Sequence, residues 1–199
     1  MSLQKKTTDY YNKNSLAMAR KFAEFGGNYN IEQVITLLGK DNPCVLEIGC
    51  GDGRDAKRIV RCTKNYLGFD ISSGMVELAE KRVPQARFLV RNSETYNFPK
   101  NIDIIFALTS LLHSSKVQLK NIFNKAYKSL NSGGIFYISL KYDKYHREIK
   151  KDNLGTRVFY FYTPKEILAI AGKKFKLIEK VVHVQKGRKF FIIVLQKIR

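Results

Sequence analysis

Three glycines at alternate positions, preceded by a carboxylate, are the residues whose types and spacing most clearly indicate chemistry in this chain. They lie in residues 45–55, Val-Leu-Glu-Ile-Gly-Cys-Gly-Asp-Gly-Arg-Asp, where a short apolar run leads into Gly49, Gly51 and Gly53. Because glycine has no side chain, such a loop lets a ligand lie directly against the main chain. Glu47 adds a carboxylate at the end of the predicted strand. The pattern predicts a loop that binds a nucleoside cofactor.

Two other interpretations of this loop are weaker. A simple turn between a strand and a helix needs one glycine rather than three. The dinucleotide-binding loop has the same order of strand, glycines and helix, but its third glycine falls where this chain has Arg54. That glycine allows the helix to pack closely on the strand, and a long cation is a poor substitute for it.

Asp70 supplies a second polar group at the same predicted edge. It ends the apolar segment 66–70 and follows Gly51 by 19 residues. A carboxylate at the tip of the second strand can accept hydrogen bonds from both hydroxyls of a ribose. Asp70 could instead cap the helix that follows, although Ser72 or Ser73 could cap it equally well.

These residues resemble the class I S-adenosylmethionine-dependent methyltransferases, and the resemblance runs through nearly the whole chain. Glu47, the three glycines, Asp70, Ser72 and Met75 carry it, together with three later segments, 87–98, 103–113 and 129–141. These segments are similar to the family's third motif, to its fourth strand with the loop facing the methyl group, and to the turn and fifth strand of its small-molecule branch. In the third motif an acidic residue normally contacts the adenine amino group. Asn92 stands there in this chain, and its amide oxygen can accept the same hydrogen bond.

The resemblance implies S-adenosylmethionine as the cofactor and a set of residues that bind it. Glu47 and the glycine loop would hold the methionine part, Asp70 the ribose, and Met75 would pack near the adenine. Tyr11 lies in a segment similar to the family's N-terminal lid, where an aromatic ring covers the cofactor. Met75 could equally be a helix core residue, and Tyr11 a surface aromatic. The predicted cofactor-binding residues are Tyr11, Glu47, Gly49, Cys50, Gly51, Gly53, Asp70, Ile71, Met75, Asn92, Ser93, Ala107 and Leu108.

The elements that must position these residues alternate along the chain. Strands are predicted at 44–48, 66–70, 86–90, 102–107 and 134–140, and helices at 15–25, 31–39, 53–61, 73–82 and 115–130. Thr163 and Pro164 begin another helix, and Gly187 forms the turn of a C-terminal hairpin. Together with the resemblance, this order favours an α/β, doubly wound fold with a mostly parallel seven-stranded sheet and a C-terminal antiparallel hairpin. We expect one domain over 1–199, with a helical lid segment at 1–40 and a Rossmann-like core at 43–199.

Four residues are candidates for the side of the methyl acceptor. His113, after the fourth strand, could act as a general base near neutral pH, or it could only shape its loop. Residues 142–162 are predicted to form a long connection after the fifth strand, and long connections in compact domains are often functional. Lys141 and Arg157 match basic positions in the small-molecule relatives. With Tyr160 they are predicted to face an acceptor that carries an anionic group.

A net charge of +19 indicates a competing acceptor. Residues 141–199 hold 16 Lys and Arg against five Asp and Glu, and basic surfaces bind phosphate backbones. The alternative is therefore an RNA (tRNA or rRNA) methyltransferase. Lys outnumbers Arg, however, and no Asn-Pro-Pro-Tyr-type tetrad follows the fourth strand. A small-molecule acceptor is the preferred interpretation, and a protein that binds the cofactor without methyl transfer is a third one.

The remaining composition limits the location and the cofactors. No stretch approaches the roughly 20 apolar residues of a membrane span, and residues 1–9 lack the apolar core of a signal peptide. We therefore expect a cytoplasmic protein with no membrane partner. Cys44, Cys50 and Cys62 fit neither a disulfide framework nor a zinc site, so no metal is predicted.

Overall fold

A mostly parallel sheet with helices on both faces forms the body of the molecule. The computed structural model describes residues 1–25 and 29–198, and in these residues a seven-stranded sheet has the order β3-β2-β1-β4-β5-β9-β8. The strands, in that order, are β3 (Arg87–Val90), β2 (Tyr66–Asp70), β1 (Val45–Ile48), β4 (Ile102–Leu108), β5 (Leu130–Lys141), β9 (Arg188–Lys197) and β8 (Phe175–Gln185). Strands β3 to β5 are parallel, and β9 runs antiparallel to both β5 and β8. The predicted doubly wound sheet with its C-terminal hairpin is confirmed.

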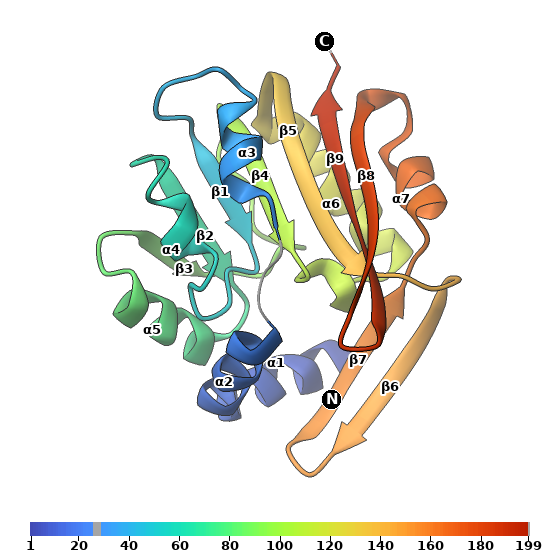
Figure 1. Cartoon of the computed structure of the whole chain (residues 1–199). Helices are drawn as coiled ribbons and strands as arrows, with labels where there is room; N and C mark the ends of the chain where they lie inside the picture. Colours follow the sequence, from blue (N-terminus) through green and yellow to red (C-terminus); the bar gives the residue numbers. More distant parts are fainter. Residues whose placement is uncertain (26–28, 199) are drawn as a thin grey trace.

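Two helical layers cover the sheet (Figure 1). One core lies between the sheet and the helices α3 (Ile31–Thr36), α4 (Ala56–Ile59) and α5 (Ser73–Arg82). A second core lies between the other face and the helices α6 (Lys116–Ser129) and α7 (Pro164–Ala171). Every residue of β1 and β4 is buried, because a central parallel strand is covered on both faces. Both strands could therefore be predicted from continuous apolar runs in the sequence.

Local signals set the start of two helices. Ser115 and Gln118 form a capping box at α6, and Thr163 and Glu166 form one at α7. In such a box each side chain bonds the backbone N–H of the other residue, so two unpaired donors of the first turn are satisfied. Pro164 occupies the first turn of α7, as predicted.

The predicted long connection 142–162 is wrong, because this segment forms a second, two-stranded sheet. Strand β6 (His146–Asp152) pairs antiparallel with β7 (Gly155–Phe161). Most side chains of β6 are exposed, so the strand has no alternation of apolar and polar residues by which its sequence could be recognised. The ribbon projects beyond the main sheet (Figure 1).

Two N-terminal helices lie across the end of the sheet toward which the parallel strands point (Figure 1). They are α1 (Leu3–Lys13) and α2 (Ser15–Phe25), and only α2 is predicted above. Part of the expected lid segment 1–40, residues 26–28, lies outside the described residues, as does residue 199 of the expected domain. Among the described helices, none is long and apolar enough to cross a membrane.

Candidate functional site

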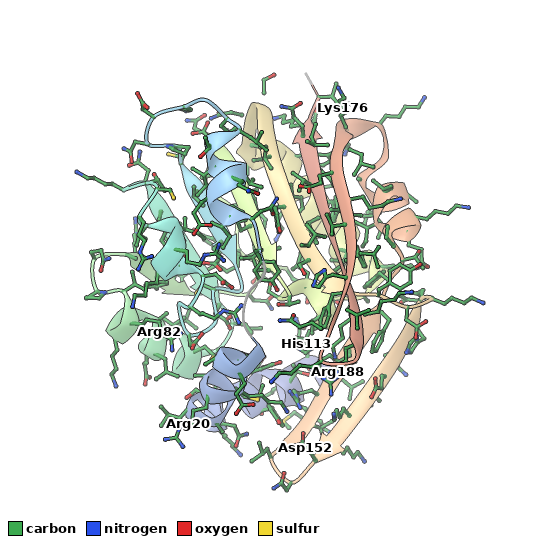
Figure 2. All side chains as sticks on the ribbon, viewed as in Figure 1. Arg20, Arg82, His113, Asp152, Lys176 and Arg188 are labelled. Carbon is green, nitrogen blue, oxygen red and sulfur yellow. The ribbon has the colours of Figure 1, made fainter. Side chains whose placement is uncertain are left out.

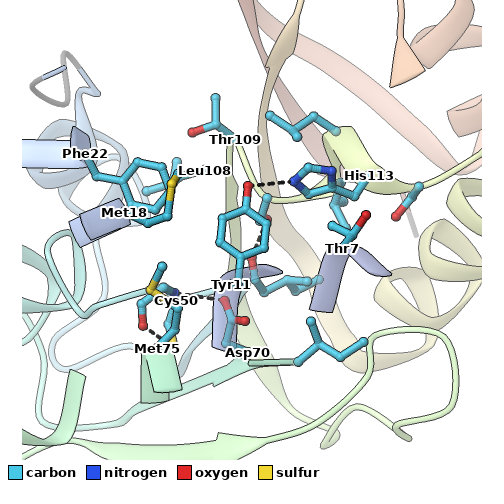
Figure 3. Close-up of a pocket in the computed structure, with 18 of the residues that line it drawn as sticks. Thr7, Tyr11, Met18, Phe22, Cys50, Asp70, Met75, Leu108, Thr109 and His113 are labelled. Atoms are coloured by element: carbon cyan, nitrogen blue, oxygen red, sulfur yellow. Dashed lines mark hydrogen bonds between the residues drawn. The ribbon is translucent and has the colours of Figure 1, made fainter. Parts of the chain in front are cut away.

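A cavity of about 280 Å³ opens where the carboxyl ends of β1, β2 and β4 meet the N-terminal helices. The loops after these strands form one wall, and α1, α2 and the ribbon β6–β7 form the others (Figure 3). Ligands of open α/β sheets bind at this edge. The volume is close to the lower end of the range for small-molecule pockets, about 300–1,000 Å³.

The three glycines of the loop differ in what surrounds them. All have positive φ, +72° at Gly49, +55° at Gly51 and +76° at Gly53. A Cβ at Gly49 would lie 2.2 Å from the Cβ of Ser110, whereas one at Gly51 would meet no atom within 4 Å. Gly49 therefore permits close packing of two loops, and Gly51 leaves open space.

Gly53 does not line the cavity, in contrast to its predicted role in cofactor binding. Its missing Cβ faces the backbone and side chain of Ala79 in α5, at 3.0–3.3 Å. Gly53 instead allows α5 to approach the loop.

Asp70 lies on the cavity wall with both oxygens fixed by the backbone. Oδ2 accepts from the N–H of Gly51 at 3.0 Å and Oδ1 from the N–H of Ser72 at 2.9 Å. Ser72 itself caps α5, so Asp70 is not needed as the cap. Burial raises the pKa of Asp70. Each oxygen retains capacity to accept a further hydrogen bond, which suits the two hydroxyls of a ribose.

Glu47 lies deeper in the same wall, with only 1% of its surface exposed. The hydroxyl of Tyr66 donates to its Oε2 at 2.5 Å. Burial, reinforced by the nearby Asp55, raises the pKa of Glu47 well above its usual range. Cys50 is buried beside it and also lines the cavity.

The predicted adenine side consists of residues from the ends of β2, β3 and β4. Ile71, Met75, Asn92, Ser93 and Leu108 all line the cavity. Asn92 Oδ1 already accepts from the N–H of Glu94 at 2.8 Å, so one lone pair remains for a ligand. Met75 also packs with Tyr10 and Met18 in a small core, so it is a core residue as well as part of the cavity wall.

Ala107 does not line the cavity. It is fully buried in the core between β4 and the helices α6 and α7. Side chains alternate between the faces of a strand, and only the end of β4, at Leu108, reaches the cavity.

His113 and Tyr11 form a hydrogen-bonded pair inside the cavity (Figure 3). His113 Nδ1 contacts the carbonyl of Val158, and because a carbonyl can only accept, this nitrogen carries the proton. Nε2 is then the acceptor, and the Tyr11 hydroxyl donates to it at 3.0 Å. Burial lowers the pKa of His113 to about 4 and raises that of Tyr11 to about 12. At neutral pH both groups are uncharged.

Three of the four predicted acceptor-side residues, His113, Lys141 and Arg157, line the cavity. Arg157 is 5% exposed, donates from Nη2 to Asp152 at 3.1 Å and lies 4.1 Å from the ring centre of Tyr10. Its Nε is buried and has no hydrogen-bond partner among the described residues. Lys141 Nζ lies 3.7 Å from the ring centre of Phe159. Burial, with the nearby Arg188, lowers the pKa of Lys141 to about 8.

Tyr160 does not line the cavity. Residues 157, 159 and 161 lie on one face of β7, and residue 160 lies on the other, because side chains alternate along a strand. Arg157 and Tyr160 are three residues apart, and two residues at this spacing lie on opposite faces of a strand.

Several residues of the cavity wall are absent from the predicted set. They include Gln4, Thr7, Thr8, Met18, Phe22, Tyr29, Arg54, Asp55, Thr109, Ser110, Lys150, Phe159 and Arg188. Thr7, Thr8 and Tyr11 are close in sequence, and the spacing of four between Thr7 and Tyr11 would place them on one helix face. This signal becomes informative only once 3–13 is identified as a helix.

Comparisons with known proteins agree with this geometry. Residues 45–134 match a family model described as a methyltransferase domain. Malonyl-[acyl-carrier protein] O-methyltransferase 1 of Ilyobacter polytropus is 29% identical over 144 residues, which are 67% of this chain and 53% of that protein. The chain thus spans about half of this relative's length. Ribosomal RNA small subunit methyltransferase A of Mycoplasmopsis synoviae is 23% identical over 184 residues, 82% of this chain and 71% of that protein.

A solved structure supports the same fold. It is the 1,6-didemethyltoxoflavin-N1-methyltransferase of Burkholderia thailandensis with bound 1,6-didemethyltoxoflavin and S-adenosylhomocysteine. The TM-score is 0.72 at 14% identity, with 94% of this chain and 84% of that chain covered. The matched residues include the glycine loop and Asp70, and the structure places these around one cavity. Residues 45–134 thus match a methyltransferase domain, and the chain has the fold of S-adenosylmethionine-dependent methyltransferases.

Proposed function

We propose that this protein transfers the methyl group of S-adenosylmethionine to a small-molecule acceptor. The observation that carries the proposal is the position of Asp70, held by the backbone of Gly51 and Ser72 on the wall of a cavity. A carboxylate with free accepting capacity, beside a glycine with open space, suits a ribose lying against the loop. The relatives and the fold support the same activity.

When bound, S-adenosylmethionine supplies an electrophilic methyl group on a sulfonium, and the protein's task is alignment and exclusion of water. Asp70 would hold the ribose, and Gly51 would let the cofactor lie against the loop. Tyr11 and Phe22 of the N-terminal helices form part of the opposite wall. They would cover the reacting atoms.

His113 acts in this proposal as a positioning residue rather than a general base. Its Nε2 is already occupied by the Tyr11 hydroxyl, and its pKa of about 4 makes it a weak base at neutral pH. It would hold Tyr11 in place by linking α1 to β7 through the carbonyl of Val158. His113→Gln should raise the KM for S-adenosylmethionine more than it lowers kcat. The variant should keep the same dependence of kcat on pH as the wild type.

Calorimetry with S-adenosylhomocysteine tests the cofactor part of the proposal. We expect one molecule to bind per chain, and Asp70→Asn to weaken binding about tenfold, since a hydrogen bond to a charged group contributes about 1.5–3 kcal/mol. Asp41→Asn is the matched control, because Asp41 is exposed and does not line the cavity. Absence of binding at millimolar ligand would contradict the proposal.

The acceptor is tested by the S-adenosylhomocysteine formed with pooled metabolites and, separately, with transfer RNA. RNA is the second candidate, favoured by the net charge of +19 and the ribosomal RNA methyltransferase relative. Product formed with metabolites alone supports the small-molecule proposal, and product formed with RNA alone supports the alternative. Binding without product in either pool would favour a cofactor-binding protein that does not transfer methyl groups.

A further inference from the structure

A second cavity of about 290 Å³ adjoins the first, at the end where the ribbon β6–β7 meets the hairpin β8–β9. We call the first the inner cavity and the second the outer cavity. The outer cavity is lined by Lys141, Tyr142, Glu148, Lys150, Phe159, Phe161, Arg188 and Lys189. Lys141, Lys150, Phe159 and Arg188 line both cavities. The two cavities therefore adjoin each other at these four residues.

The outer cavity is strongly basic. Four of its lining residues are Lys or Arg, and Glu148 is the one acid among the described lining residues. Two of the cations contact aromatic rings: Lys141 Nζ lies 3.7 Å from the ring centre of Phe159, and Lys189 Nζ lies 4.9 Å from that of Tyr142. A ring face attracts a cation, but it does not neutralise its charge.

The acids of the inner cavity lie on one of its sides. Glu47, Asp52, Asp55 and Asp70 are on the glycine-loop side, together with the cations Arg54 and Arg91, whereas the ribbon side carries Lys141, Lys150, Arg157 and Arg188. The buried Nε of Arg157, which has no partner among the described residues, is on the ribbon side. Burial is the main cause of the lowered pKa of Lys141, and the nearby Arg188 lowers it further, because a positive charge disfavours the protonated form of its neighbour. An anion at this place would relieve that repulsion.

We propose that the outer cavity binds an anionic group, a phosphate or a carboxylate, carried by the acceptor. This proposal rests on the proposed methyl transfer, and it specifies the acceptor as a small molecule. Its nucleophile lies in the inner cavity and its anionic group lies between the ribbon and the β8–β9 hairpin. Lys141, at the junction of the two cavities, contacts the anion from the inner side. The aromatic rings of Phe159 and Phe161 form the apolar wall along which the rest of the acceptor lies.

A small anion suits this site better than a nucleic acid backbone. The cations surround a concave space of about 290 Å³, which is large enough for one anionic group, whereas a strand of RNA is bound along an extended basic groove. The partly buried Lys141 lies inside the space rather than on an exposed stripe.

The test uses the full chain saturated with S-adenosylhomocysteine, with phenyl phosphate as the probe and phenol as its neutral analogue. Saturation fills the cofactor site, including any contact that its carboxylate makes, so further binding of an anion must use another place. Calorimetry should show one phenyl phosphate bound per chain and no binding of phenol. Because binding of S-adenosylhomocysteine is measured first, failure of the proposed function and failure of this inference give different results.

Three single substitutions locate the site. Lys141→Gln should weaken phenyl phosphate about tenfold, as expected for loss of a charged hydrogen-bond donor. Glu148→Gln, which removes the acid of the outer cavity, should strengthen binding about threefold. Lys176→Gln is the matched control, since Lys176 is exposed and lies at the opposite end of the β8–β9 hairpin from Arg188 (Figure 2). It should leave the affinity unchanged.

Four results would overturn the inference. The first is phenyl phosphate that binds only when S-adenosylhomocysteine is absent, because the anion would then occupy the place of the cofactor carboxylate. The second is an equal effect of Lys141→Gln and Lys176→Gln, which would indicate diffuse surface charge. The third is the absence of binding at millimolar phenyl phosphate. The fourth is a short single-stranded RNA that binds to the saturated protein and displaces phenyl phosphate, because the site would then be a nucleic acid groove.

Discussion

Gly39 and Gly51 share a left-handed backbone and open space at the missing side chain, yet only Gly51 lines the inner cavity. Their φ angles are +56° and +55°, and neither would place a Cβ within 4 Å of another atom. Alanine at either position should therefore cost a similar backbone strain, about 1–2 kcal/mol of unfolding free energy. At Gly51 alone the new methyl group would also occupy the space assigned to the cofactor.

We expect Gly51→Ala to weaken S-adenosylhomocysteine binding at least tenfold, and Gly39→Ala to leave it unchanged. Calorimetry measures the affinity, and urea denaturation measures the shared loss of stability. Equal affinities in the two variants would show that the cofactor does not lie against the loop.

His113 should make stability depend on pH in a defined window. Its pKa is about 4 in the folded protein and 6.5 in the unfolded chain, so between these values the unfolded state binds more protons. Stability from this group is present above pH 6.5 and is lost as the pH falls toward 4. The expected loss is roughly 2–3 kcal/mol.

Urea denaturation of the wild type and of His113→Gln across this pH range isolates the contribution. The difference in unfolding free energy between them should shrink as the pH falls. A difference that stays constant from pH 7 to 4 would contradict burial of a neutral imidazole. His183, whose pKa is also lowered, is unchanged in both proteins and does not enter the difference.

Sequence spacing predicted the position of some site residues better than others. Asp70 was predictable because it ends a buried strand, and parallel strand ends meet at one edge. The positions of Gly53 and Tyr160 were not predictable, because the direction in which each residue faces depends on elements that lie outside its own sequence motif. Gly53 faces Ala79 of α5, and Tyr160 faces away because 155–161 is a strand.

At the scale of elements, the helix α1 is attached to the ribbon by three side chains one or two turns apart. Thr7 Oγ1 accepts from the N–H of Val158 at 3.0 Å, Tyr10 donates to Asp152 at 3.1 Å, and Asn14 donates to the carbonyl of Leu154 at 3.1 Å. These contacts join the wall of the cofactor side to the wall of the acceptor side. The three hydrogen bonds therefore restrain the ribbon against the N-terminal helix.

Thr7→Ala tests this attachment. It leaves the buried N–H of Val158 without its partner, which should cost about 1–3 kcal/mol and speed hydrogen exchange at that amide. Thr36→Ala is the control, because Thr36 bonds a carbonyl within the exposed end of α3. If both variants exchange equally slowly at Val158, α1 does not restrain the ribbon.

The strands of the core could be predicted from the sequence and those of the ribbon β6–β7 could not, for one physical reason. Strands such as β1 and β4 are buried on both faces, and burial requires an apolar run that a sequence displays. The ribbon β6–β7 is largely exposed on its first strand, and its pairing is set by backbone bonds that any residue can make. The ribbon β6–β7, on the proposed acceptor side of the cavity, is therefore the hardest part of the chain to predict from its sequence.

At the scale of the whole molecule, positive charge lies both around the two cavities and on surface remote from them. One group of cations surrounds the two cavities. Others are exposed elsewhere, such as Lys176 at the far end of the β8–β9 hairpin from Arg188 (Figure 2) and Lys173, three residues before it in the sequence. Charge spread over a surface binds RNA without sequence preference, and this binding weakens steeply with salt. Positive charge around a cavity instead attracts an anionic ligand inside that cavity. The net charge of +19 therefore does not by itself identify the acceptor.

This separation predicts opposite effects of two substitutions on two ligands. The double variant Lys173→Gln, Lys176→Gln should weaken binding of total RNA in filter assays at low salt, reducing the slope of log affinity against log salt by about 1 for each phosphate that is no longer neutralised. It should leave phenyl phosphate binding unchanged. Lys141→Gln should weaken phenyl phosphate binding and leave RNA binding unchanged, because Lys141 lies against the aromatic rings of Phe159 and Phe161. RNA affinity that depends on Lys141, and methyl transfer to RNA that persists at physiological salt, would instead make the cavities part of an RNA-binding surface.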